Sequence, residues 1–368
     1  MADSLKVGVV GSGGRGGSFK RAFELQDEAH IHAVCDIDRE ALEASRIRLG
    51  AAEAYVQYEE MLEVADVEAV VVGTPMPLHV PQAIAALERD IHVLSEVPAG
   101  VSIEECHELV AACQRSEAVY MMAENYIYSK ANMMVTELVR QGLFGTTYYA
   151  EGEYIHELKA LNEETPWRRK WQTGINGITY GTHSLGPILQ WMPDDRVVSV
   201  CCAGSGHHYR DPRGDLYENE DSCVMLCKMA SGGLVKIRVD MLSDRPHAMH
   251  NHSLQGVDGC YESARAPGER DRIWLRAESE DPNAWLDLEA LDAFVPREWR
   301  ESASVISQLG HGGGDYFVVK DFVDAVVESK PPRVGIHEAM DMTLPGLVSQ
   351  QSIIQGGKWL PVPDSRTW

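Results

Sequence analysis

Short apolar segments alternate with amphipathic ones along the first third of the chain, and this alternation restricts the fold more than any other feature. The predicted strands are the apolar runs 6–10, 31–35, 69–72, 91–94 and 119–122. Segments such as 39–49, 80–87 and 103–113 have the apolar spacing of helices, and Ser102 and Glu105 form a capping-box pattern before the last of them. Continuous apolar strands separated by helices are typical of a parallel, doubly wound sheet.

The pattern changes after Asn125. A predicted helix at 129–140 is followed by longer segments that alternate apolar and polar residues, at 146–154, 197–203, 222–229 and 234–241. Such alternation is typical of an antiparallel sheet with two different faces. Helical patterns at 317–328 and 338–355 close the chain. We therefore expect an α/β protein with a parallel-sheet domain at 1–125 and, at 126–368, a second α/β domain with a large, mainly antiparallel open sheet.

A glycine-rich turn directly follows the first predicted strand. It reads Gly11, Ser12, Gly13, Gly14, Arg15 and Gly16, a GxGxxG motif. Glycines there permit a tight turn and let backbone N–H groups approach a pyrophosphate. Asp36 closes the second strand 20 residues beyond Gly16, where its carboxylate would bind a ribose 2′-hydroxyl and repel a 2′-phosphate. This predicts a Rossmann domain that binds NAD, although the nearby Arg39 would suit NADP and a glycine turn also occurs in ordinary α/β domains.

Composition excludes several classes of partner. Asp and Glu total 56 against 33 for Lys and Arg, a net charge of −23, which argues against nucleic acid and anionic membranes. The eight cysteines include no CxxC pair, so neither a zinc site nor a disulfide framework is expected. Without a leader-like start or an apolar run of membrane-spanning length, the expected compartment is the cytoplasm.

Further motifs fall at predicted strand ends, at 73–79, 95–100 and 123–125. With the glycine turn, they resemble the family of glucose-fructose oxidoreductase, inositol dehydrogenase and MocA over the whole chain. Most members resembling this pattern carry Glu-Lys-Pro where this chain has Glu96-Val97-Pro98. An aliphatic side chain can neither move a proton nor stabilise an alkoxide. Another group therefore acts as the base, or the chain is not a working redox enzyme.

Glu-Val-Pro-Ala is also used by one branch of that family, the NAD-dependent glycosidases of glycoside hydrolase family 109, described for α-N-acetylgalactosaminides. The chain resembles this branch in six further segments, at 121–125, 140–145, 151–156, 167–168, 180–187 and 311–315. The resemblance implies NAD contacts by the glycine turn and by Asp36, Thr74, Met76, His79, Glu96, Val97 and Asn125. It implies sugar contacts by Tyr154, Arg168, Tyr180, Gly181, Thr182 and His183. His247 is a further expected sugar contact, where the branch has a tyrosine after Arg-Pro.

Enzymes of this branch resemble dehydrogenases that later return the hydride. Oxidation at sugar carbon 3 acidifies the hydrogen on carbon 2, the aglycone is eliminated, water adds, and the alcohol is restored, outside the usual scheme of two carboxylates. The residues needed are a base near carbon 2, an acid near the leaving oxygen and donors to an enolate. The resemblance points to His183 as acid/base assisted by Tyr180 and Tyr154, with Glu124 as a second candidate.

Other interpretations of these residues stay open. Tyr180 and His183, three apart at a helix start, could form a core pair, and Tyr154 could be ordinary sheet packing. His250 and His252 would share a strand face, but no third ligand is set by spacing, so no metal is expected. Arg168, Arg169 and Lys170 form a cationic cluster that is either solvated or able to bind an acidic sugar. His156, His207 and His208 are interpreted as surface or loop residues.

Three functions remain under consideration. The first is an NAD-dependent glycosidase, the second is an NAD-dependent sugar or polyol dehydrogenase or 3-keto-sugar oxidoreductase with net redox turnover, and the third is a nucleotide-binding regulator without catalysis. Val97 favours the first over the second, and the segment 180–183 favours both over the third. The expected partner is a small sugar or glycoside, and the resemblance implies a homodimer or homotetramer.

Overall fold

The computed structural model describes residues 4–246, 248–306 and 309–368, which form two compact units. The first comprises the described residues of Met1–Tyr128, Ala303–Met340 and Ser365–Trp368. The second comprises those of Ser129–Ser302 and Asp341–Asp364. Two segments from the C-terminal part of the chain thus belong to the first unit. The predicted boundary after residue 125 places these segments in the second domain instead.

The first unit contains a parallel sheet. Its six described strands run in the order β3-β2-β1-β4-β5-β6, and every paired neighbour is parallel. Their bounds are β1 Leu5–Val10, β2 Ala29–Cys35, β3 Glu53–Tyr55, β4 Ala69–Val72, β5 His92–Ser95 and β6 Tyr120–Met122. The predicted doubly wound sheet is confirmed. Because the strand order reverses direction between β1 and β4, the carboxyl ends of these two strands are where a Rossmann sheet binds its ligand.

Local signals explain most helices of this unit. They are η1 Arg15–Phe19, α1 Lys20–Phe23, α2 Arg39–Leu49, α3 Tyr58–Val64, η2 Met76–Leu78, α4 His79–Leu87, α5 Ile103–Arg115, η3 Tyr126–Tyr128, η6 Gly310–Gly313, α11 Gly314–Val327 and η7 Ser365–Thr367. The Asp38 side chain caps α2, and Gly50 ends it in a left-handed conformation. Ser102 accepts a hydrogen bond from the Glu105 N–H at the start of α5, as the capping pattern predicts. After the glycine turn there is only a 3₁₀ turn and one α turn.

The second unit contains a wide, mostly antiparallel sheet. Its nine described strands run in the order β14-β13-β12-β11-β7-β10-β9-β8-β15, and only the β7–β10 pair is parallel. Their bounds are β7 Thr147–Ile155, β8 Val197–Gly204, β9 Ser222–Met229, β10 Leu234–Asp240, β11 His250–Gly256, β12 Gly259–Glu262, β13 Arg272–Leu275, β14 Leu286–Asp287 and β15 Leu360–Pro361. The expected large open sheet is therefore confirmed.

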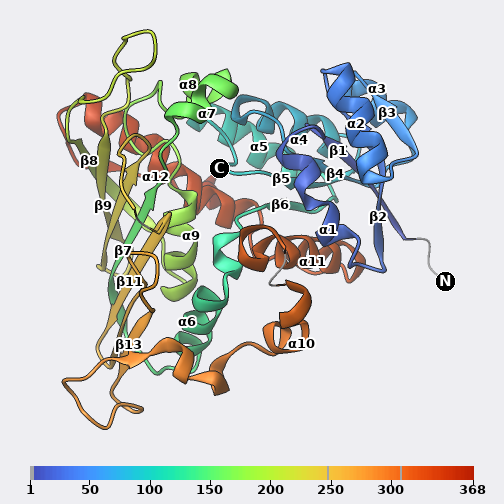
Figure 1. Ribbon diagram of the computed structural model, residues 1–368. Coiled ribbons are helices and arrows are strands. Elements are labelled where there is room, and N and C mark those ends of the chain that lie inside the picture. Colours follow the sequence, from blue (N-terminus) through green and yellow to red (C-terminus); the bar gives the residue numbers. More distant parts are fainter. Residues whose placement is uncertain (1–3, 247, 307–308) are drawn as a thin grey trace. The chain divides into compact units, whose positions relative to one another are not determined.

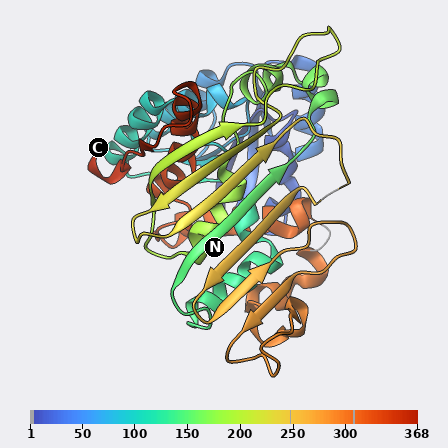
Figure 2. The same ribbon diagram turned by 90° about the vertical axis from the view of Figure 1, so that its left-hand side faces the viewer.

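Helices lie on one face of this sheet. The unit includes α6 Lys130–Arg140, α7 Lys159–Glu164, α8 Pro166–Trp171, α9 Thr182–Trp191, η4 Leu288–Ala290 and η5 Asp292–Phe294, together with parts of α10 Arg297–Ile306 and α12 Ile336–Ile354. Helix α9 packs on β7 and β11 (Figure 1). A Cβ on Gly152 of β7 would lie 2.7 Å from the Ser184 carbonyl oxygen, so glycine there lets α9 approach the sheet. In the described part of the chain, no helix crosses the opposite face (Figure 2).

The described residues include no helix that is both long and apolar enough to cross a membrane.

Candidate active site

The glycine turn lies at the carboxyl end of β1. Gly11 has a φ of +74°, and a Cβ there would lie 2.6 Å from the Gly73 carbonyl oxygen, so the turn and its approach to the end of β4 both require glycine. The Gly13 N–H donates a hydrogen bond to Asp36 Oδ2 at 2.9 Å. The predicted pyrophosphate turn and the predicted ribose carboxylate are therefore brought together.

His79 ties two further strand ends together. It is buried, and its ring nitrogens lie 2.9 Å from the carbonyl oxygens of Thr74 and Pro98. Thr74 follows β4, and Pro98 follows β5 and the buried Val97. Met76 is also buried in this segment, at the start of η2. The residues predicted to contact NAD after β4 and β5 are thus held against one another.

An ion-pair network fixes Arg15 of the glycine turn. Its Nε lies 2.7 Å from Glu96 Oε1, and its terminal nitrogens donate to the two carboxylate oxygens of Asp315 at 2.9 and 2.8 Å. His311 Nδ1 lies 3.1 Å from the same carboxylate. Burial alone would raise the pKa of Asp315, but hydrogen bonds from Arg15 and His311 lower it well below its ordinary value. The Arg15 guanidinium therefore binds carboxylates of the protein and is not directed to a phosphate.

Asn125 and Glu124 follow β6. Asn125 Nδ2 donates to Asp315 Oδ1 at 3.3 Å, whereas its buried Oδ1 has no protein partner among the described residues. Glu124 is fully buried and accepts a hydrogen bond from the Tyr126 N–H at 3.1 Å. A buried acceptor such as Asn125 Oδ1 is satisfied by a donor from a bound molecule, as an amide of a nicotinamide would supply. With the glycine turn and Asp36, the first unit fits NAD.

Three aromatic side chains form a cluster in the second unit. Ring centroids of Tyr154 and Tyr180 lie 5.6 Å apart, those of Tyr154 and His183 5.1 Å, and those of Tyr180 and His183 5.0 Å. Tyr154 comes from β7, Tyr180 lies two residues before the start of α9, and His183 lies in the first turn of that helix. The three residues predicted for acid/base chemistry are therefore brought together around the start of one helix.

His252 of β11 supports that helix start. Its Nε2 lies 3.3 Å from the His183 carbonyl oxygen, and its ring packs edge-on against Trp191. Burial, together with the nearby His250, lowers the pKa of His252 to about 3. The ring is thus neutral, and in that form its Nε2–H can donate to the His183 carbonyl. His250 and His252 do lie side by side, with centroids 5.8 Å apart, but no metal-binding group of three acidic, His or Cys residues occurs among the described residues.

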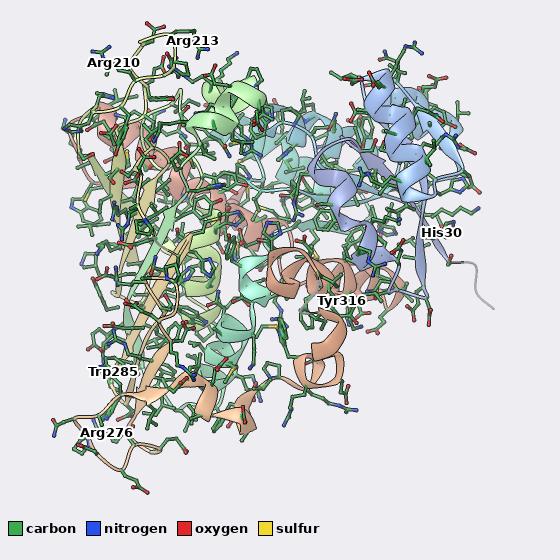
Figure 3. The ribbon with its side chains drawn as sticks, in the orientation of Figure 1. His30, Arg210, Arg213, Arg276, Trp285 and Tyr316 are labelled. Atoms are coloured by element: carbon green, nitrogen blue, oxygen red, sulfur yellow. The ribbon has the colours of Figure 1, made fainter. Side chains whose placement is uncertain are left out.

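The cationic cluster on α8 divides into two environments. Arg169 pairs with Asp211 at 3.4 Å and with Glu218 at 2.5 Å, on the loop between β8 and β9 that also carries Arg210 and Arg213 (Figure 3). Arg168 instead donates to Gln172 Oε1 at 2.9 Å and stacks on Trp167, and its buried Nε has no protein partner among the described residues. Arg168 is thus the member of the cluster that has a buried donor left for a ligand.

The remaining predicted sugar contacts lie at or beside α9. Gly181 is its N-cap residue, and Thr182 is its first residue. The buried Thr182 hydroxyl has no protein partner within the described ranges. His247 lies outside the described residues.

Comparison with known protein families gives two matches along the chain. Residues 128–367 match the family described as glycosyl hydrolase 109, C-terminal domain. The chain belongs to glycosyl hydrolase family 109. Residues 5–124 match the oxidoreductase family with an NAD-binding Rossmann fold, so NAD is the cofactor. The predicted family, cofactor and enzymatic nature are confirmed.

Relatives in glycosyl hydrolase family 109 align along most of the chain. A family 109 protein of Saccharopolyspora erythraea is 29% identical over 98% of this chain and 83% of its own length. One from Streptomyces filamentosus is 30% identical over 98% of this chain and 77% of its own length. A protein of Shewanella oneidensis named alpha-N-acetylgalactosaminidase is 27% identical over 98% and 84% of the two chains.

Solved structures share the fold. The WlbA dehydrogenase of Bordetella pertussis, in complex with NADH and UDP-GlcNAcA, superposes with a TM-score of 0.81 at 21% identity, covering 99% of both chains. Levoglucosan dehydrogenase, in complex with NADH and levoglucosan, gives 0.81 at 18% identity over 98% of this chain and 100% of its own. At these identities the likeness establishes the fold alone.

Two residues of the family 109 chain were missed as site candidates. Asp315 binds Arg15 although the two residues are 300 positions apart. The only sequence signal for Asp315 was its place in the segment 311–315, which resembles the family. His156, interpreted as a surface or loop residue, is half-buried, and its Nδ1 lies 2.9 Å from the Tyr154 hydroxyl. Its position two residues after Tyr154 on an extended segment was a signal for this contact, because such side chains share a face.

Proposed function

We propose that this protein is an NAD-dependent glycosidase that hydrolyses its substrate through transient oxidation at sugar carbon 3. The observation that carries the proposal is the mutual contact of Tyr154, Tyr180 and His183 in the unit that matches the family 109 model. Val97 supports it, because this position offers no ammonium group for a dehydrogenase to use as a base.

Bound NAD would supply the hydride acceptor that converts the carbon-3 hydroxyl to a ketone and so acidifies the hydrogen on carbon 2. Removal of that proton lets the glycosidic oxygen leave carbon 1. Water then adds to the enone, and the carbon-3 alcohol is restored. The net reaction is hydrolysis without consumption of NAD, and it needs no pair of catalytic carboxylates.

Side chains of the aromatic cluster suit these proton transfers. His183 acts as acid/base because imidazole exchanges protons near neutral pH. The Tyr180 hydroxyl donates a hydrogen bond to the oxygen on which negative charge develops, and Tyr154, in contact with both His183 and Tyr180, assists the proton transfer. Glu124 of the first unit is the second candidate for a proton-transfer role. Arg168 and Thr182 would bind sugar hydroxyls, and a cation at Arg168 would also accept an acidic sugar.

The first substrate to test is an α-N-acetylgalactosaminide, in view of the Shewanella oneidensis relative of that name. Aryl glycosides of both anomers should be assayed in deuterated water. We expect aglycone release with deuterium at carbon 2 of the sugar product and no accumulation of NADH. NADH growing in step with product would instead establish a dehydrogenase, and binding of NAD with neither reaction across a glycoside panel would indicate a regulator.

Substitution of His183 gives a second test of the same proposal. His183→Ala should lower kcat by roughly 10²- to 10⁴-fold, the usual contribution of a general acid/base. NADH binding should stay unchanged, because the residues predicted to contact NAD all belong to the first unit. His208→Ala is a matched control, since this exposed imidazole is paired with Asp221 at 2.6 Å. Full activity in His183→Ala would remove this residue from the mechanism.

We also propose that copies of the protein associate through the helix-free face of the nine-stranded sheet. The resemblance to a family with homo-oligomeric members supports this, as does the breadth of the face (Figure 2).

A further inference from the structure

Tyr154 is in hydrogen-bond contact with an imidazole that lies behind it. Its hydroxyl oxygen is 2.9 Å from His156 Nδ1, and the two rings meet edge to face with centroids 5.7 Å apart. The two residues are separated by one position at the end of β7, so their side chains share the sheet face on which α9 packs. This contact is additional to the cluster of Tyr154, Tyr180 and His183.

Main-chain hydrogen bonds fix the position of His156. Its N–H donates to the Asp240 carbonyl at 2.9 Å, and the Ile155 N–H donates to the Met249 carbonyl at 2.8 Å. The segment is therefore bonded on both sides, to the end of β10 and to the residue before β11. A side chain on such a restrained backbone keeps a defined geometry toward its partner, as proton transfer requires.

Because Tyr154 is buried, its hydroxyl needs a nearby proton acceptor in order to ionise. Tyr154 is only 5% exposed, and its ring packs against those of Tyr180 and His183. Ionising a buried phenol is unfavourable unless its proton passes to a neighbouring group or its charge is stabilised. Imidazole is the side chain best suited to accept a proton near neutral pH.

We propose that His156 is the proton acceptor behind Tyr154 and that the pair is the base that removes the carbon-2 proton. In the Nε2–H tautomer of His156, the Tyr154 hydroxyl donates to Nδ1. The sugar C–H bond breaks as its proton passes to the Tyr154 oxygen, while the phenolic proton moves to Nδ1. The electron pair of the C–H bond stays on the sugar as an enolate, and the positive charge resides on His156. This step rests on the proposed function, because carbon 2 is acidic only beside a carbon-3 ketone.

This division assigns different tasks within the cluster. His183 then serves the leaving glycosidic oxygen, and Tyr154 backed by His156 serves carbon 2. His156 does not touch the sugar in this scheme; it is a positioning residue that acts through Tyr154.

The test compares His156→Asn, His156→Ala and Tyr154→Phe. An asparagine Oδ1 takes the place of the imidazole Nδ1 and accepts a hydrogen bond, but it does not take up a proton. We expect both His156 variants to lower kcat by about 10²-fold or more, with KM changed by less than about threefold. Deuterium exchange at carbon 2 should slow in parallel. Recovery of wild-type kcat in His156→Asn would show a purely structural role and overturn the proposal.

Controls separate this proposal from the proposed function. His208→Asn makes the same substitution at another histidine whose Nδ1 is hydrogen-bonded, and its activity should equal the wild type. If the wild-type protein neither releases aglycone nor exchanges carbon 2, the proposed function fails. If the wild type does both and His156→Asn matches it, only the role of His156 fails. In a Tyr154→Phe background, His156→Asn should cause no further loss, because coupled residues are not additive.

A measurement on the wild type covers the case in which the His156 variants do not fold. Nitrogen-15 NMR of histidine-labelled protein reports which ring nitrogen carries the proton. We expect the Nε2–H tautomer at His156, with Nδ1 accepting from Tyr154. A neutral Nδ1–H tautomer would overturn the proposal, because Nδ1 would then be the donor.

Discussion

Two residues on adjacent strands decide how closely the helix that carries His183 approaches the sheet. Gly152 and His252 are paired in register between β7 and β11. Glycine leaves room for the Ser184 carbonyl, and the His252 ring reaches the His183 carbonyl. Because burial lowers the pKa of His252 to about 3, the residue enters the fold neutral. Its ordinary value is 6.5, so the unfolded chain binds the proton more tightly than the folded one.

Stability should therefore depend on the protonation of His252. Its contribution is fully present above pH 6.5 and falls as pH drops toward the folded-state pKa, by roughly 1.4 kcal/mol per pH unit. Between pH 6.5 and 5, the free energy of unfolding of the wild type should fall by roughly 2 kcal/mol more than that of His252→Gln, whose amide does not titrate in this range. Urea unfolding at both pH values measures the difference. His30→Gln, at an exposed histidine (Figure 3), is the control, and equal slopes in His252→Gln and wild type would refute the prediction.

Sequence predicted residues well where the signal is local and poorly where it is not. Gly11, Gly13 and Asp36 were found because one motif sets their spacing, and the structure brings them together. Tyr154, Tyr180 and His183 were found through the resemblance to a family, and the structure shows their contact. The role of Asp315 depends on chain folding across 300 positions, so spacing alone does not reveal it.

At the scale of elements, the loop and helix at η6 and α11 complete the cofactor-binding end of the parallel sheet. Asp315, in the first turn of α11, binds Arg15 of the glycine turn and Asn125 after β6. Arg15 in turn binds Glu96 after β5. The Asp315 carboxylate thus connects the segments that follow β1 and β6 directly, and the segment that follows β5 through Arg15.

Removal of that charge should weaken cofactor binding. In Asp315→Asn, Arg15 loses a buried bidentate partner, and charge-assisted bonds of this kind contribute about 1.5–3 kcal/mol each. We expect the Kd for NADH, measured by fluorescence titration, to rise by about tenfold or more. Asp324→Asn on the same helix, where the carboxylate binds Lys320 at 2.8 Å, should leave the Kd unchanged. Wild-type affinity in Asp315→Asn would contradict the role given to this residue.

Helices and strands could be predicted from the sequence where an uninterrupted apolar pattern marks them. The strands at 69–72 and 222–229 and the helix at 39–49 were predicted with the observed bounds. A continuous apolar run marks the first, alternation of apolar and polar residues marks the second, and helical periodicity with a cap at Asp38 marks the third. Of β11 only the part at His250 and His252 was interpreted as a strand, and β12 to β14 were not predicted, because they have only two to four residues each. Their pairing with neighbouring strands defines them: β11 to β14 pair consecutively, and β11 also pairs with β7, which is distant in sequence.

At the scale of the whole molecule, the helix-free sheet face is the surface expected to join copies. Leu226 lies opposite Lys236, which lies opposite Glu151, and Glu151 points away from α9 because its neighbour Gly152 faces that helix. Leu226 is thus an apolar side chain on the helix-free face. A charge at this point should be unfavourable in a buried interface.

We expect the wild-type protein to be a dimer or tetramer by light scattering and Leu226→Glu to shift it toward the monomer. Ile354→Glu, at a side chain that is 79% exposed, should leave the assembly unchanged. A wild-type protein that stays monomeric up to high micromolar concentration would refute the prediction.

The path of the chain between its two compact units also limits how the molecule can be divided. The backbone passes from one unit to the other after residues 128, 302, 340 and 364. A fragment ending at residue 128 would keep the glycine turn but lose Asp315, whose carboxylate binds Arg15. Neither unit can therefore be exchanged between relatives as one continuous stretch of chain. A chimaera designed to change sugar specificity would have to exchange all the separate segments that make up the second unit.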